Sequence, residues 1–339
     1  MILVCHVSYH WARNFLINFE SGDFKTSVLS LTNQIFCSKF PKEAVVNAAL
    51  SSFNLSSSNT KTYLVSSNPK FAGDASFLEV LNGFTKVGNY LWIGDKEIYY
   101  PGGVIPVTVS AADFFKEFYL EQNPQVAENL WQNRQIFGPR IPTNDYEMSI
   151  ESAGTSAKVK FAVSRLYDAV LKDTARIIIS GSPPLFFDNP VKILWPLIRS
   201  INNAGVWEVA IDSRDAFSAL AFANFFDSGL FDNFLNNEVI QNTATIMVIP
   251  GAKKISVSFS AESVQEFDLS SGEPLFLPLA EGSEVQVMVV AKKSVSQTVV
   301  GAEHGVLIDP RMRPVSEPAS KAQALKESEK AAKVFGSKI

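Results

Sequence analysis

Hydrophobic and polar positions alternate in short runs along the first hundred residues. The run MILVCHVSYHWARNFLINFE, followed by the turn residues SGD, predicts two strands, and FKTSVLSL, KTYLVSS and NYLWIGDKEIYY predict further strands. In the last of these, Gly94 and Asp95 lie between two aromatic-rich runs and indicate the tip of a hairpin. The run PKEAVVNAALSSF predicts a short helix. We therefore expect this part of the chain to be rich in β-structure.

Helical spacing of apolar residues dominates after the run PGGVIPVT. Ser110 is placed to cap a helix over AADFFKEFYLEQN. A long helix is predicted to begin near PTNDYEMSIESAGTSAKVKF, with Thr143 or Asn144 as its cap. Asp145 and Glu147 lie in its first turn, where the helix dipole favours negative charge.

The order of the next elements predicts a parallel βαβ unit. ARIIISG is typical of a buried strand, a helix is expected to begin at Asp188 and end at Gly205, and VWEVAI is the next strand. SRDAFSALAFANFF predicts one more helix. Strand, helix, strand and helix in this order favour parallel strands joined by a right-handed crossover.

The pattern of apolar and polar residues changes again after Asn242. ATIMVIP, KKISVSFS, EPLFLPL, SEVQVMVVAKK and GVLID predict short strands separated by turn residues, as in a small barrel or sandwich. The last residues are polar and rich in alanine and lysine, which is typical of a tail or a frayed helix. We expect four parts: a β-rich lobe at 1–109, an α/β lobe at 110–242, a β-domain at 243–314 and a polar tail at 315–339.

Composition and charge exclude several classes of protein. Apolar residues make up 46% of the 339 residues and the formal net charge is −4, whereas a nucleic-acid-binding protein would show a clustered basic face. No apolar run approaches the roughly 18 residues that a membrane helix needs. The first residues lack the basic segment and the cleavage site of a signal peptide. We expect a cytoplasmic protein that binds no nucleic acid.

Histidine and cysteine are too few to suggest a metal site. The only such residues are Cys5, Cys37, His6, His10 and His304. Alternation along a strand places His6 and His10 on one face and Cys5 on the other, and no carboxylate lies nearby in sequence. The chain also lacks a Gly-Lys-Ser/Thr phosphate loop and the GxGxxG, HExxH and GxSxG motifs. We therefore assign no metal ligand and no catalytic residue.

Two pairs of residues are candidates for binding phosphate through backbone N–H groups. Gly102 and Gly103 allow a close approach of the backbone to an anion, although a turn between two lobes explains them more simply. Gly181 and Ser182 follow a buried strand, where α/β proteins bind ligands. Two prolines come directly after them and offer no N–H group, which weakens this site.

Asp212 ends the next predicted strand. Its side chain either faces the same crevice as Gly181 and Ser182 or caps the helix that begins at Ser213, and we favour the cap.

The middle and later parts of the chain resemble the glutamate mutase accessory protein family. The residues concerned are FGPRIPTNDYEMSIESAGTSAKVKFAVSRL, ARIIISGSPPLFFDNPVKILWPLIRSI and EVAIDSRDAFSALAFANF, and the run GVLIDPRMRP is similar to the end of longer members. The resemblance covers roughly residues 135 to 320 and includes no single diagnostic motif. It implies membership of the superfamily of actin, sugar kinases and heat-shock chaperones.

This chain departs from that superfamily where ATP would bind. The resemblance implies an aspartate and glycines in the first hairpin, but the hairpin VCHVSYHWARNF has neither. For the second phosphate turn the chain offers only IGDKE and YPGGVIPVT, and the glycine pair on the adenosine side would fall at Gly181 and Ser182. Without a carboxylate and Mg²⁺, the charge that develops in phosphoryl transfer has no stabilising partner.

We therefore expect an actin-like (ribonuclease H-like) α/β fold with a degenerate ATP site and a small C-terminal all-β domain. The expected role is that of a non-catalytic scaffold or assembly protein that binds another protein and needs no cofactor. One alternative is an ATP- and Mg²⁺-dependent chaperone or reactivase of a cofactor-dependent mutase, in which His6, Ser8 and His10 replace the missing acid. A second is a cytoplasmic platform of a pilus or secretion machine, with only indirect membrane contact because the terminal helix is weakly amphipathic.

The stretch GVLIDPRMRP combines an apolar run with an aspartate and two arginines. Pro310 ends the strand because it lacks a donor for the ladder. Asp309 lies within reach of Arg311 or Arg313 for a charge-assisted ion pair. We interpret these three residues as a structural latch, since the sequence places no nucleophile, base or metal ligand beside them.

Overall fold

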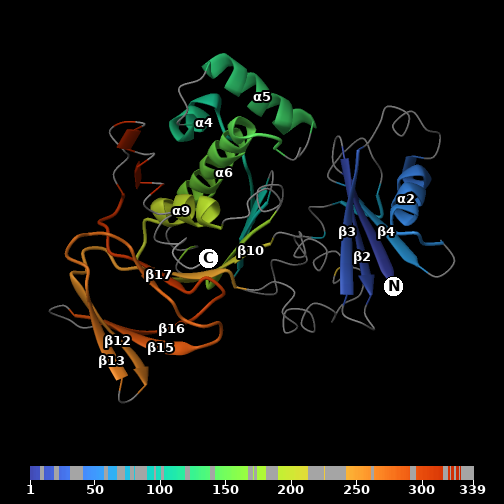
Figure 1. Cartoon of the computed structure of the whole chain (residues 1–339). Helices are drawn as coiled ribbons and strands as arrows, with labels where there is room; N and C mark the ends of the chain where they lie inside the picture. Colours follow the sequence, from blue (N-terminus) through green and yellow to red (C-terminus); the bar gives the residue numbers. More distant parts are fainter. Residues whose placement is uncertain are drawn as a thin grey trace. The chain divides into compact units, whose positions relative to one another are not determined.

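The structure is a computed structural model, and the chain forms two compact units (Figure 1). Unit 1 comprises Met1–Gly88, Gln132–Arg140 and Arg214–Ile240, and unit 2 comprises Asn89–Trp131, Ile141–Ser213 and Gln241–Ile339. The residues described are 1–7, 11–18, 23–30, 41–56, 60–66, 73–76, 80, 90–94, 97–100, 103–118, 123–137, 142–166, 171, 174–180, 190–212, 225, 242–260, 263–290, 295–315, 320, 322, 323, 326, 327 and 329.

Unit 1 contains a five-stranded sheet in the order β3-β2-β1-β4-β5. Its strands are β1 (Ile2–Val7), β2 (Trp11–Asn18), β3 (Asp23–Ser30), β4 (Lys61–Ser66) and β5 (Ala75–Ser76). The first three strands pair antiparallel, whereas β1 with β4 and β4 with β5 pair parallel. The helix α2 (Pro41–Ser52) connects β3 to β4 in sequence.

Helix α2 covers one face of this sheet. Leu3, Cys5 and Val7 of β1 share a buried cluster with Val45 and Ala49 of α2. These β1 residues are two positions apart, so they point to one face of the sheet, as the alternation of a strand requires. Burial of this apolar face against α2 explains why the short helix is stable here.

Unit 2 contains an eight-stranded sheet in the order β14-β17-β11-β10-β9-β6-β7-β8. Its strands are β6 (Tyr90–Ile93), β7 (Glu97–Tyr100), β8 (Gly103–Pro106), β9 (Arg176–Ile179), β10 (Gly205–Ile211), β11 (Ala244–Val248), β14 (Leu275–Leu277) and β17 (Val306–Asp309). Strands β6, β7 and β8 pair antiparallel, while β6 with β9 and β9 with β10 pair parallel. Strand β11 then pairs antiparallel with β10 and parallel with β17.

The same strand order occurs once in each unit. In unit 1, the chain runs through an antiparallel meander β1-β2-β3 and then adds β4 and β5 parallel to β1. In unit 2, it runs through the meander β6-β7-β8 and then adds β9 and β10 parallel to β6. Helices lie between the third and the fourth strand in both cases. The two units are therefore built on one topology.

Helices α4 (Ala111–Glu117), α6 (Asp145–Arg165) and α9 (Val191–Ser200) belong to unit 2, and α5 (Pro124–Phe137) begins in unit 2 and has its residues from Gln132 onward in unit 1. The predicted caps are confirmed, because Ser110 Oγ accepts a hydrogen bond from the N–H of Asp113 and Asn144 Oδ1 accepts one from the N–H of Glu147. The predicted βαβ order is confirmed as well, since α9 joins the parallel strands β9 and β10.

Unit 2 has three layers (Figure 1). Helices α6 and α9 pack on one face of the large sheet with Ile246 and Val248 of β11. Met247, between these two residues, belongs instead to a cluster shared with a four-stranded antiparallel sheet. That sheet has the order β13-β12-β15-β16 and consists of β12 (Lys254–Ser260), β13 (Ser263–Asp268), β15 (Glu284–Val289) and β16 (Val295–Val300). Alternation along β11 thus supplies both cores.

The mixed α/β character expected from the sequence is confirmed, but the grouping of the strands differs from the expected one. Strands β6 to β8 were expected in the N-terminal lobe, and they pair with β9 in unit 2. Strands β11, β14 and β17 were expected in a separate β-domain, and they extend the large sheet. A separate C-terminal all-β domain is therefore not confirmed, although β12, β13, β15 and β16 form a sheet of their own.

Candidate functional site

The carboxyl ends of β6, β9 and β10 lie side by side at one end of the strands of the large sheet, because the three strands are parallel. The N–H of Ser180 donates to the carbonyl of Ile93, 3.0 Å away, and the N–H of Asp212 donates to the carbonyl of Ile179 at 2.9 Å. These bonds continue the ladder by one step and fix Ser180 beside Asp212. Open α/β sheets bind ligands at the carboxyl ends of their parallel strands.

Ser180 and Asp212 form a buried pair at the carboxyl ends of β9 and β10. The hydroxyl of Ser180 donates to Oδ2 of Asp212 over 2.8 Å, and the two residues are 1% and 4% exposed. A hydroxyl donor stabilises the carboxylate form of an aspartate. The pair joins two neighbouring strand ends, and its carboxylate also has the chemistry to orient a hydroxyl group or the water shell of a cation.

The other residues predicted for this crevice divide into two groups. Gly102, Gly181 and Ser182 lie outside the described residues, as does Ser213, so the capping of a helix by Asp212 stays a prediction. Gly103 begins β8 opposite Tyr100, and a Cβ atom on Gly103 would lie 2.9 Å from the Tyr100 hydroxyl. The side chain of Tyr100 therefore lies close to Gly103, and binding of phosphate by Gly102 and Gly103 stays a prediction.

The ends of the parallel strands of unit 1 carry different residues. The last row of paired residues there consists of Val7, Ser66 and Ser76. One step back along β1, His6 lies opposite Arg13 of β2, and both are buried. Residues 1 to 19 include no aspartate and no glutamate. The last paired row of unit 1 thus offers two hydroxyl groups, whereas the carboxylate of unit 2 lies one position beyond its last paired row of Ile93, Ile179 and Ile211.

Cys5 and His6 do not combine into a metal site. Cys5 packs on the face of β1 that α2 covers, and His6 is its neighbour on an alternating strand, so the two side chains point to opposite faces. Burial raises the pKa of the Cys5 thiol to about 12, which keeps it protonated at neutral pH. Among the described residues, no three His, Cys, Asp or Glu side chains are grouped to hold a metal ion.

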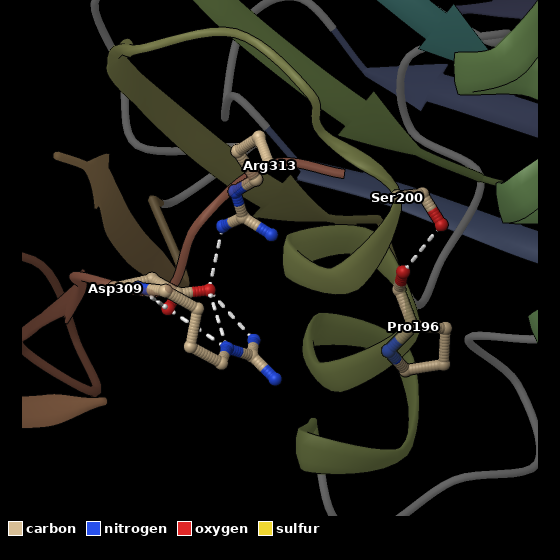
Figure 2. A network of polar contacts seen from close by, with 5 residues as sticks. Pro196, Ser200, Asp309 and Arg313 are labelled. Atoms are coloured by element: carbon tan, nitrogen blue, oxygen red, sulfur yellow. Dashed lines mark hydrogen bonds and ion pairs between the residues drawn. The ribbon is translucent and has the colours of Figure 1, made fainter. Parts of the chain in front are cut away.

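Asp309 lies at the centre of an ion-pair cluster at the end of β17 (Figure 2). Its Oδ1 accepts hydrogen bonds from the N–H of Arg311 at 3.0 Å and from Arg311 Nε at 2.8 Å. Its Oδ2 accepts from Nη2 of Arg311 and from Nη2 of Arg313, each over 2.6 Å. Asp309 is 0% exposed. Paired charge-assisted bonds of this kind are among the strongest hydrogen bonds in proteins.

Burial and aromatic contact complete the cluster. The guanidinium carbon of Arg311 lies 4.7 Å from the centre of the Trp195 ring, on α9, which is a cation–π distance. The Arg313 side chain is 5% exposed, and its burial lowers its pKa, an effect that the charge of Asp309 opposes. The cluster therefore holds the end of β17 against α9, and the role of a latch is a prediction that this geometry supports.

The sequence analysis missed two features of unit 2 because their residues are far apart in the chain. Trp195 carries no signal in the sequence for its contact with Arg311. Glu117 of α4 and Lys160 of α6 form a buried ion pair over 2.5 Å, with side chains 5% and 22% exposed. The only hint was Glu117 beside the phenylalanines of α4, since a buried carboxylate needs a partner.

No helix among the described residues is both long and apolar enough to cross a membrane.

Comparisons with known proteins give little similarity. No protein-family model and no curated protein matches the chain. Among solved structures, it is similar to the activator of the 2-hydroxyisocaproyl-CoA dehydratase from Clostridium difficile with bound ADPNP, at a TM-score of 0.36 and 11% identity, over 70% of this chain and 96% of that chain. It is also similar to the ethanolamine utilization protein EutJ from Carboxydothermus hydrogenoformans, at a TM-score of 0.34 and 8% identity, over 64% of this chain and 86% of that chain. Similarity this low shows neither the family nor the function of this chain.

Proposed function

We propose that this chain is a non-catalytic, actin-like assembly protein that binds another protein. The resemblance to the superfamily of actin, sugar kinases and heat-shock chaperones implies two ribonuclease H-like lobes. The repeated strand order supports this reading, because β3-β2-β1-β4-β5 and β8-β7-β6-β9-β10 have the same pattern of antiparallel and parallel pairs. A duplicated fold of this kind is a scaffold on which many functions occur, so function depends on the strand ends.

The difference between the strand ends carries the proposal. Phosphoryl transfer needs carboxylates that hold Mg²⁺ beside the phosphates. The parallel strands of unit 1 end in Val7, Ser66 and Ser76, and the first hairpin contains no acidic residue. In unit 2 the buried aspartate Asp212 comes one position after the last paired row of Ile93, Ile179 and Ile211. The sequence has no acidic residue directly after β1, β4 or β5 of unit 1, where Ser8, Ser67 and Phe77 follow, and this supports binding without catalysis.

A nucleotide titration tests this proposal. We expect no change in the melting temperature of the purified chain with millimolar Mg-ATP or Mg-ADP, and no release of phosphate. A ligand present at about 100 times its Kd stabilises the folded state by about 2.7 kcal/mol, so specific binding would be visible as a shift of a few degrees. Asp212→Asn is the matched control, because it keeps the shape of the side chain and removes its charge. Phosphate release that Asp212→Asn abolishes would overturn the proposal.

A second experiment tests the protein-binding part. Chemical cross-linking in a cell extract identifies candidate partners, and each is then purified and titrated against the chain by calorimetry. We expect at least one direct complex whose affinity is the same with and without Mg-ATP. A complex that forms only while ATP is hydrolysed would contradict a non-catalytic role.

One observation favours a second candidate function, an ATP-dependent chaperone or reactivase. The buried pair of Ser180 and Asp212 lies at the carboxyl ends of β9 and β10, where α/β proteins bind ligands. Mg-ATP that raises the melting temperature of the wild type but not of Asp212→Asn would support this function.

A further inference from the structure

Among the described residues, no strand pairs with the outer side of β13, at one edge of the four-stranded sheet. Strand β13 (Ser263–Asp268) pairs with β12 on one side and is the last strand in the order β13-β12-β15-β16. All of its described residues are exposed except Phe267, which is half-buried. Open edges of this kind accept a further strand unless their side chains prevent it.

The register shows which backbone groups of β13 point outward. The N–H of Leu269 donates to the carbonyl of Lys253 over 2.8 Å, which makes Leu269 and Lys253 a hydrogen-bonded pair. Such pairs alternate along an antiparallel ladder, so Phe267 and Gln265 also bond to β12. The N–H and carbonyl groups of the residues between them then face away from β12. These residues are Val264, Glu266 and Asp268.

The side chains of these three residues define what this edge can bind. Val264 is 58% exposed, and the strand carries two carboxylates and no lysine or arginine. Glu266 Oε2 forms an ion pair with Nζ of Lys254 on β12, 2.5 Å away, and both side chains are about half exposed. The hydrogen bond of Asp268 with Ser270 holds the pKa of that carboxyl below its ordinary value, so it is charged at neutral pH. The open edge is thus acidic, with one apolar contact.

We propose that β13 is a docking strand for an extended segment of a partner protein that carries lysine or arginine at alternate positions. Main-chain hydrogen bonds to the outward groups of Val264, Glu266 and Asp268 would provide affinity, and basic side chains opposite the two carboxylates would provide selectivity. This inference rests on the proposed function as a protein-binding scaffold and names the surface that binds.

Charge argues against a second copy of this chain as the occupant. Two β13 strands paired antiparallel about Glu266 would place the two Glu266 carboxylates directly opposite each other, and like charges in that position are destabilising. The other edge strand of the same sheet, β16, has outward backbone groups at Ser296 and Thr298 and no charged side chain, while its Val300 carbonyl accepts a hydrogen bond from Thr245 Oγ1 at 2.7 Å. It serves as the internal comparison for β13.

Two synthetic peptides test the proposal. Each is a labelled seven-residue peptide in which every second residue is valine, and the residues between are lysine in one and glutamate in the other. Fluorescence anisotropy measures binding to the whole chain. We expect the lysine peptide to bind at least about tenfold more tightly than the glutamate peptide, as two favourable charge pairs require.

Three variants locate the binding on β13. Val264→Pro removes an outward N–H group and leaves every charge in place, so we expect it to weaken lysine-peptide binding at least about tenfold. Thr298→Pro is the matched control on β16 and is expected to bind like the wild type. Glu266→Lys combined with Asp268→Lys is expected to reverse the preference between the two peptides. Circular dichroism and the melting temperature establish that each variant is folded.

Three results would overturn this assignment: equal binding of the two peptides, unchanged binding by Val264→Pro, or a dimer that Val264→Pro dissolves. Each of them leaves the nucleotide and partner titrations untouched, so failure of the docking strand is distinguishable from failure of the proposed function.

Discussion

Two buried aspartates lie at opposite ends of the eight-stranded sheet. Asp212 follows β10, and Asp309 ends β17 in the same row as Val248 and Gly205, the first residue of β10. Strand β17 runs parallel to β11 and therefore antiparallel to β10, which places Asp309 at the end of the sheet away from Asp212. Both are almost completely buried, so exposure does not distinguish them.

Their partners distinguish the two ends. Asp309 accepts hydrogen bonds from two guanidinium groups, which satisfy both of its oxygens. Asp212 receives a neutral hydroxyl hydrogen bond from Ser180. The two arginines match the charge of Asp309 and hold it at the end of β17, whereas the hydroxyl of Ser180 ties Asp212 to the neighbouring strand end. A buried aspartate at a strand end is therefore not a functional signal until its partners are known.

Removal of the Asp309 carboxylate gives the largest expected effect. Asp309→Ala removes the counter-charge of the buried Arg313 side chain and of the partly buried Arg311 side chain, and loss of one partner of a buried ion pair costs about 3–5 kcal/mol. Urea unfolding of the wild type and the variant measures the difference. We expect Asp309→Asn to lose free energy of unfolding in the same range, because this variant keeps the shape of the side chain and loses its charge.

The control for this prediction is Glu281→Ala, which removes the carboxylate of an exposed turn residue and is expected to change the free energy of unfolding by less than about 0.5 kcal/mol. If Asp309→Ala unfolds at the same urea concentration as the wild type, the three residues are not a latch. If it retains stability but loses binding of a purified partner, the cluster belongs to a functional site.

Cys5 adds a third case, a buried titratable group without a counter-charge. Burial raises its pKa from 9.0 to about 12, so between these values the unfolded chain loses the thiol proton and the folded chain keeps it. The free energy of unfolding is therefore unaffected below about pH 9 and falls by about 1.4 kcal/mol per pH unit above it.

Other groups titrate in the same range, so the measurement is a difference between two proteins. Urea unfolding of the wild type and Cys5→Ala at about pH 8 and about pH 10 isolates the contribution of the thiol. We expect the wild type to lose about 1.4 kcal/mol more than Cys5→Ala over this interval. Equal losses would show that the thiol is accessible to water in the folded state.

The smallest expected effect is at the other end of the sheet. Ser180→Ala removes the hydroxyl donor of Asp212, and loss of one neutral hydrogen bond costs about 1 kcal/mol. The same urea experiment measures it. A loss as large as that of Asp309→Ala would remove the contrast between the two ends and would make Asp212 a second structural anchor.

Features set by neighbours in the chain were predictable from the sequence. The caps Ser110 and Asn144 bond to N–H groups three residues ahead, and Asp309 bonds to arginines two and four residues ahead. The parallel pairing of β9 with β10 was also predictable, since the order of strand and helix leaves few alternatives. The contact between Ser180 and Asp212 then follows from the register.

Features that depend on the partner of a strand or helix were not predictable. The meander β6-β7-β8 looks like a continuation of the β-rich start of the chain, and only its pairing with β9 assigns it to unit 2. Likewise, nothing local distinguishes β11, β14 and β17, which join the large sheet, from β12, β13, β15 and β16, which form their own.

The sequence by itself determined many of the helices and strands, although not α5, β8, β13 or β16, and it determined the caps and the ion pairs of Asp309. These features depend on hydrophobic periodicity and on residues a few positions apart. The tertiary structure decided that the strand order is repeated, that Trp195 lies against Arg311, and that the edge of β13 is open. Strand pairing and packing join residues that are distant in sequence, and an alternating apolar pattern fixes which face of a strand is buried without specifying what buries it.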